Sequence, residues 1–101
     1  MYTRLEGECL MIEMKGDIDH HHASRIREEV KLMLSFHPVR EVVMDFKDAG
    51  FMDSSAIGLV LGRYIDANEA GAGLKLINTG ERVKKMLKLG GIYKLKGIVI
   101  E

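Results

Sequence analysis

The sequence has few of the features that mark secreted, membrane or nucleic-acid-binding proteins. Its one cysteine, Cys9, cannot form a disulfide within the chain, which predicts a reducing compartment. Fifteen Lys and Arg residues balance fifteen Asp and Glu residues, so no positive excess is available to hold a phosphate backbone. No apolar run is long enough to cross a bilayer, and the charged, alternating stretch Met1–Lys15 is not typical of a signal peptide. We expect a cytoplasmic protein without nucleic-acid or membrane partners.

Proline is nearly absent, and glycines mark most of the breaks between predicted elements. The 101 residues suffice for one compact domain over residues 1–101 and are too few for two. Hydrophobic residues make up 47% of the chain, which argues against disorder. The single proline, Pro38, follows a predicted helix and breaks the chain before the next strand.

The stretch Val42–Tyr64 predicts a central strand followed by a buried helix. Val42–Phe46 is apolar and β-branched apart from Asp45, as is typical of a strand buried on both faces. A helix is predicted from about Ser54 to Glu69, and its inward face at helical spacing consists of Ile57, Val60, Leu61, Tyr64 and Ile65. On this assignment Arg63 points outward.

Two glycines lie inside this helix, at Gly58 and Gly62, on one face of it. Each costs roughly 1 kcal/mol of helix stability relative to Ala. We expect them to let the helix backbone approach the sheet or a partner closely.

Other segments alternate between strand and helix patterns. Strands are predicted at Tyr2–Leu5, Cys9–Lys15, Arg40–Phe46, Leu74–Ile77 and somewhere in Lys94–Ile100, and further helices at His20–Phe36 and after Asn78. In the last helix the side chains expected to face out are Arg82, Lys84, Lys85 and Lys88. This order predicts an antiparallel hairpin followed by parallel pairings with helical crossovers, which is an α/β fold. The expected core includes Leu10, Ile12, Val42, Val43, Met44, Ile57, Leu74 and Leu76.

Three N-cap residues in a row, Asp53-Ser54-Ser55, open the buried helix. A helix start has free N–H groups and positive partial charge, so a phosphate added to a serine there finds donors in place. One serine suffices as a cap, which leaves a second hydroxyl for another use. A hydrolase nucleophile is a poor interpretation, because Met52 and Ala56 stand where a Gly-x-Ser-x-Gly elbow needs glycine.

Two separated motifs carry a family resemblance. They are Phe51-Met52-Asp53-Ser54-Ser55, continued by Gly58 and Leu61-Gly62-Arg63-Tyr64, and Gly16-Asp17-Ile18-Asp19-His20-His21. Together they resemble the phosphorylation loop, second helix and first turn of the STAS-domain anti-sigma factor antagonists, above all those that serve the sporulation sigma F factor. One departure is Ala56, where many members carry Gly.

The resemblance implies a STAS fold, with a mixed, mostly parallel sheet, an N-terminal hairpin and helices packed mainly on one side. It also implies a phosphorylation-controlled binding protein rather than an enzyme, with no catalytic residues, cofactor or metal. The unphosphorylated form would bind an anti-sigma factor that is also a serine kinase and would free the sigma factor. The kinase, with its ATP, would phosphorylate Ser54 and so end binding, and a serine phosphatase would reset the protein. Relatives usually add a helix after the last strand.

The partner-binding residues expected from the resemblance and the sequence are Asp19, His20, His21, Met52, Asp53, Ser54, Ser55 and Arg63. For Asp53 two interpretations stay open, a cap or a charge beside the phosphate. His20-His21-His22 is a poor metal site, because consecutive helical side chains point in different directions. The alternative function is a STAS module that senses a small ligand, such as a nucleotide, within a larger signalling assembly.

Overall fold

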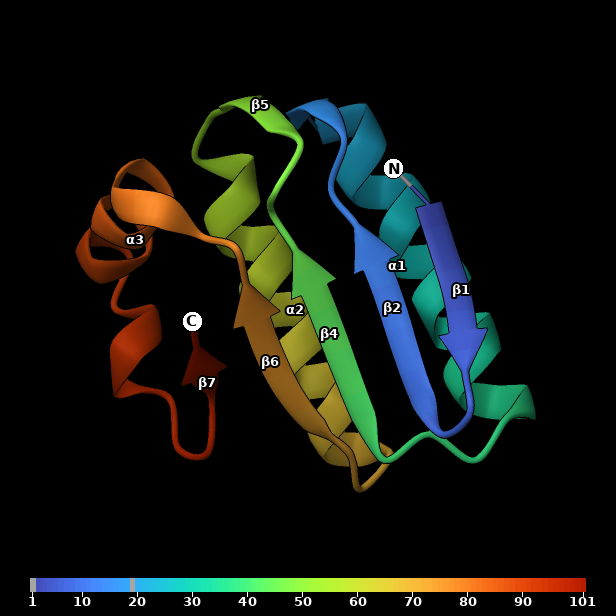
Figure 1. Ribbon diagram of the computed structural model, residues 1–101. Coiled ribbons are helices and arrows are strands. Elements are labelled where there is room, and N and C mark those ends of the chain that lie inside the picture. Colours follow the sequence, from blue (N-terminus) through green and yellow to red (C-terminus); the bar gives the residue numbers. More distant parts are fainter. Residues whose placement is uncertain (1, 19) are drawn as a thin grey trace.

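Five strands form the main sheet of the computed structural model, which describes residues 2–18 and 20–101 and leaves the side chains of His20 and His22 outside the description (Figure 1). In sheet order they are β1 (Tyr2–Glu6), β2 (Cys9–Glu13), β4 (Glu41–Asp45), β6 (Gly73–Ile77) and β7 (Val99–Ile100). The β1–β2 pair is antiparallel and the other pairs are parallel. The mixed, mostly parallel sheet with an N-terminal hairpin is thus confirmed.

Two long helices, α1 (His20–Phe36) and α2 (Ser55–Glu69), lie side by side behind the sheet in Figure 1. A third, α3 (Gly80–Leu89), lies on the β6–β7 side of the sheet and leads through a 3-10 turn, η1 (Ile92–Lys94), into β7. No described helix covers the opposite face of the sheet. None of the described helices is both long and apolar enough to span a membrane.

The core lies between the sheet and the two long helices. In the sheet register Leu10, Val42 and Leu74 form one row of neighbours across three strands, and Ile12, Met44 and Leu76 form the next row. All six side chains are buried, and Val43 is also buried although it points to the uncovered face. The expected core is confirmed except for Ile57, which is only half-buried and packs at the edge of the core.

A second, two-stranded sheet was not predicted. The expected strand from Cys9 to Lys15 is too long, because β2 ends at Glu13, and the chain then forms β3 (Gly16–Ile18), which pairs in parallel with β5 (Ala49–Met52). Both strands are too short and too rich in glycine to give a periodic signal. This pair carries the segment before α1 and the loop before α2 to the same place, at the top of Figure 1.

Close packing holds β3 against β5. The carboxylate of Asp17 accepts a hydrogen bond from the backbone N–H of Phe51 at 2.8 Å. A Cβ atom added to Gly50 would lie 2.6 Å from Asp17 Oδ1, which is closer than real Cβ contacts come. Glycine at position 50 therefore lets the two strands approach, and this approach fixes the loop that leads into α2.

Candidate functional site at the start of helix α2

Asp53, and neither serine, caps helix α2. The backbone N–H of Ser55 donates a hydrogen bond to Asp53 Oδ1 at 2.8 Å. Ser54 occupies the N-cap position with helical backbone angles, φ −61° and ψ −17°, and its side chain makes no capping hydrogen bond. A helix start needs an acceptor for its free N–H groups, and the carboxylate supplies it. Both hydroxyls are thereby released from capping, with Ser54 exposed and Ser55 half-buried.

Arg82 reaches from α3 to the loop before α2. Its Nη2 donates to the backbone carbonyl oxygens of Gly50 at 2.9 Å and Ala49 at 3.4 Å. Arg82 is exposed, as predicted, and its guanidinium in addition contacts the backbone of the loop. Nothing in the local sequence could have indicated the contact, because it joins two segments that are distant along the chain. A basic side chain is thus held close to the loop that carries Ser54.

A hollow of about 490 Å³ lies beside Ser54, between the loop, α2 and α3. We call it the Ser54 hollow, and its lining residues are Met52, Asp53, Ser54, Ile57, Arg82, Lys85, Met86, Leu89 and Gly90. Apolar side chains make up much of this lining, and two basic side chains stand among them. Among the apolar lining residues, Leu89 is 84% exposed. The hollow has the composition of a small protein-docking surface.

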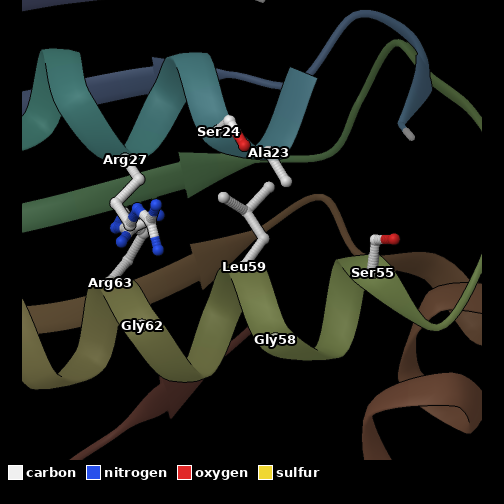
Figure 2. A pocket seen from close by; sticks show the side chains of 8 residues that line it. All are labelled: Ala23, Ser24, Arg27, Ser55, Gly58, Leu59, Gly62 and Arg63. Carbon is white, nitrogen blue, oxygen red and sulfur yellow. The ribbon is translucent and has the colours of Figure 1, made fainter. Parts of the chain in front are cut away.

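Ser55 faces a different space, a groove between α1 and α2. This Ser55 groove has a volume of about 430 Å³ and is lined by Ala23, Ser24, Arg27, Ser55, Gly58, Leu59, Gly62 and Arg63 (Figure 2). Its lining contains hydroxyl groups, guanidinium groups and glycine backbone, with few apolar side chains. Adjacent serines at one helix start therefore line two separate spaces.

Arg63 does not project outward as predicted. Its side chain is only 2% exposed and its Nη2 lies 3.0 Å from Asp66 Oδ2, with Asp66 itself 10% exposed. Two residues assigned inward are instead well exposed, Leu61 at 40% and Ile65 at 48%. The α2 helix is rotated relative to the expectation, because it packs against α1 as well as the sheet, and Leu59 and Ala67 are buried in place of those residues.

Burial lowers the pKa of the Arg63 guanidinium, while the charge and hydrogen bond of Asp66 raise it and the charge of Arg27 lowers it further. A guanidinium keeps its charge in spite of such shifts, so Arg63 is a buried cation with one carboxylate beside it. The predicted contact of Arg63 with a partner rested on an outward side chain, and the burial of Arg63 removes that basis.

The described part of the Gly16–His21 motif lies next to the loop that precedes α2. Ile18 pairs with Met52 across the small sheet, so the chain enters α1 beside the segment that precedes Ser54. His20 is the first residue of α1, His21 is exposed, and Asp19 lies outside the described residues, as does the His20 side chain. Among the described residues no group of three His, Cys, Asp or Glu side chains could hold a metal ion.

This fold has known counterparts. The sequence model of the STAS domain matches residues 2–98, and the chain belongs to this family. Within it, the chain is 28% identical over 89 residues to the anti-sigma F factor antagonist of Paenibacillus polymyxa, an alignment that covers 88% of this chain and 76% of the relative. The resemblance to the anti-sigma factor antagonists is thus confirmed. That class consists of regulators rather than enzymes.

Two solved structures agree with the family. The anti-sigma factor antagonist SpoIIAA in its unphosphorylated form has a TM-score of 0.79 at 25% identity, covering 99% of this chain and 86% of that chain. The Bacillus cell fate determinant SpoIIAA in the phosphorylated form has a TM-score of 0.74 at 26% identity, covering 99% of this chain and 91% of that chain. The similarity therefore extends to a protein that exists in both states.

Proposed function

We propose that residues 1–101 act as a single STAS domain that is an anti-sigma factor antagonist under phosphorylation control. The unphosphorylated form binds an anti-sigma factor that is also a serine kinase, and the sigma factor is released. The kinase then uses its ATP to phosphorylate Ser54, which ends the binding, and a serine phosphatase restores the active form. This exchange takes place in the cytoplasm, where sigma factors act on transcription, and the resemblance to the sporulation sigma F antagonists implies that it serves sporulation.

The observation that carries this proposal is the state of the Ser54 side chain. It is exposed and makes no capping hydrogen bond, because Asp53 provides the cap. A kinase can therefore bind and phosphorylate the Ser54 hydroxyl without first breaking a contact that stabilises the helix. The neighbouring serine is half-buried beside the Ser55 groove and is less accessible. Accessibility thus favours Ser54 over Ser55 as the modified residue.

The charge of a phosphate gives the switch its direction. Phosphoserine carries about −1.5 to −2 charges near neutral pH. In the free protein the start of α2 can accommodate this charge, because helix N-termini carry positive partial charge. In a complex the same phosphate would be enclosed, with loss of its hydration and with the Asp53 carboxylate close by. The phosphate therefore stabilises the free protein relative to the complex, and the complex dissociates.

The proposed partner surface is centred on the loop and the Ser54 hollow. Met52 and Ser54 line that hollow together, and an adaptable thioether suits contact with a partner. Ser55 and Asp53 follow at the same helix start. Asp19, His20 and His21 are included because the strand before them pairs with the loop. Arg63 is not included, since its side chain is buried.

The test is phosphorylation by a purified anti-sigma factor kinase of the class that the relatives antagonise, with ATP, followed by mass mapping of the phosphosite. Ser54→Ala should bind the kinase, take up no phosphate and resist release by ATP. Ser54→Asp should fold normally and bind poorly, because a carboxylate is accepted at a helix start but not in the interface. Ser55→Ala is the matched control and should be phosphorylated like wild type. Equal labelling of all three proteins and wild type would refute the switch.

A further inference from the structure

Arg82 is held against the loop by one nitrogen of its guanidinium group. Its Nη2 donates to the backbone carbonyl oxygens of Gly50 and Ala49, and these hydrogen bonds fix the side chain beside the segment that leads into α2. Among the described residues, its Nε and Nη1 have no acceptor. A guanidinium offers five N–H donors in a fixed plane, so Arg82 keeps donors for an acceptor placed in the Ser54 hollow.

The Ser54 hollow carries more positive than negative charge. Arg82 and Lys85 both line it, and Asp53 is the acidic side chain among its described lining residues. The Asp53 carboxylate is engaged as the cap of α2, where it accepts from the N–H of Ser55. In the part of the chain that the structure describes, no carboxylate lies at ion-pair distance from either cation. An anionic group on Ser54 would give both cations a counter-ion.

We infer that Arg82 and Lys85 bind the phosphate of phosphorylated Ser54 in the free protein, and that Arg82 is the residue that positions it. The inference rests on the proposed function, because it concerns the phosphate that the kinase adds. A phosphoserine opposite basic side chains forms charge-assisted hydrogen bonds with them. Arginine suits this role better than lysine, since its planar fork of donors matches the phosphate oxygens. Contacts within the chain then stabilise the phosphorylated form, in addition to the exclusion of the phosphate from the complex.

The hydrogen bonds of Arg82 to the loop bear on the strength of this contact. An exposed ion pair is usually weak, because fixing two long side chains costs entropy and salt screens the charges. Arg82 is exposed, but the two carbonyl oxygens already restrict it before any phosphate is added. The serine side chain is short and its position is set by the start of α2. We therefore expect a contact that is measurable at low salt and that weakens as salt is added.

The test uses the full chain with phosphoserine incorporated at position 54 during its synthesis, so that no kinase is required. Phosphorus NMR at low salt follows the second ionisation of the phosphate, which has a pKa of about 6 in phosphoserine. A nearby cation favours the dianion and lowers this pKa, so Arg82→Gln should raise it by about 0.5 pH unit. Lys84→Gln is the matched control, because it removes a charge from an exposed position of α3 that does not line the hollow, and it should leave the pKa near that of wild type.

Two further variants separate the charge of Arg82 from its support of the loop. Arg82→Lys restores the charge and should recover part of the lowered pKa, which a purely structural role would not do. Lys85→Gln leaves the contacts of Arg82 with the loop in place and should raise the pKa by a smaller amount than Arg82→Gln.

Equal phosphate pKa values in wild type, Arg82→Gln and Lys85→Gln would overturn the inference. A rise of the same size in Lys84→Gln as in Arg82→Gln would also overturn it, because the effect would then come from the general charge of α3. Labelling of the wild-type chain by the kinase tests the proposed function separately. A failure of the proposed function therefore appears in the labelling, and a failure of this inference appears in the phosphate pKa.

Discussion

The two sides of helix α2, one toward α3 and one toward α1, line spaces of different composition. Toward α3, the Ser54 hollow combines exposed apolar side chains such as Met52 and Leu89 with basic ones. Toward α1, the Ser55 groove is polar and holds a buried ion pair between Arg63 and Asp66. The first space is largely apolar with basic side chains at its border, and the second is largely polar. A single helix start therefore presents one serine to each of two spaces of different composition.

Both sides rest on the same sheet, so a defect in the sheet should affect both. Leu76 is fully buried in β6, beneath α2. We expect Leu76→Ala to lower the free energy of unfolding by roughly 2–5 kcal/mol, through lost burial and a cavity. Urea unfolding measures this loss, with Lys75→Ala, on the opposite face, as the control. A change in only one of the two sites, with stability unaltered, would show that they do not share this support.

A defect in the ion pair should affect the groove side alone. Asp66→Ala leaves the buried Arg63 guanidinium without its carboxylate. We expect a loss of about 3 kcal/mol in unfolding free energy, the lower end for breaking a buried pair, because the neighbouring groove admits water. Glu69→Ala, an exposed carboxylate on the same helix, is the control for thermal and urea unfolding. Labelling of Ser54 by the kinase should proceed at the wild-type rate in both variants.

A defect in the small sheet should affect the Ser54 side alone. Gly50→Ala places a methyl group against the Asp17 carboxylate and the β3 backbone, so we expect a loss of about 1–3 kcal/mol. Gly58→Ala makes the same chemical change in open space and should stabilise the protein by about 1 kcal/mol. Both variants replace glycine by alanine, so comparing their free energies of unfolding in one series isolates the steric effect at position 50. Equal stability of the two variants would mean that β3 and β5 are not closely packed.

The smallest effects should separate the cap from the serines. Asp53→Ala removes the side-chain acceptor for the Ser55 N–H and should cost about 1 kcal/mol. Ser54→Ala and Ser55→Ala should each stay within about 0.5 kcal/mol of wild type, as for surface positions without a special contact. Thermal unfolding of the three variants side by side provides the measurement. A larger loss for either serine than for Asp53 would reassign the cap.

Much of the fold was predictable because its signals are long and periodic. The helix His20–Phe36 was predicted with the bounds that the structure shows. The core residues of β2 follow from alternation, and those of β4 follow from a continuous apolar run. The pairing of β3 with β5 was not predicted, because strands of three or four residues that contain glycine show no recognisable hydrophobic period. Their pairing depends on a contact between residues that lie more than thirty positions apart, such as Asp17 and Phe51.

The site was predictable in its residues and less so in its geometry. The run Asp53-Ser54-Ser55 indicated a helix start, which the structure places at Ser55. The sequence could not show which of the three residues makes the cap. Nor could it show the rotation of α2, because its many apolar residues allow more than one inward face, and a charged Arg63 is a poor candidate for burial until its Asp66 partner is seen.

The cap by Asp53 has a consequence for sequence variation in this segment. Since neither serine hydroxyl contributes a capping hydrogen bond, the fold places little demand on the chemistry of positions 54 and 55. A library randomised at Ser54 would consist mostly of folded members, and selection on it would sort variants by recognition alone. Mutational tolerance at these two positions then reports what a partner requires, uncoupled from what folding requires.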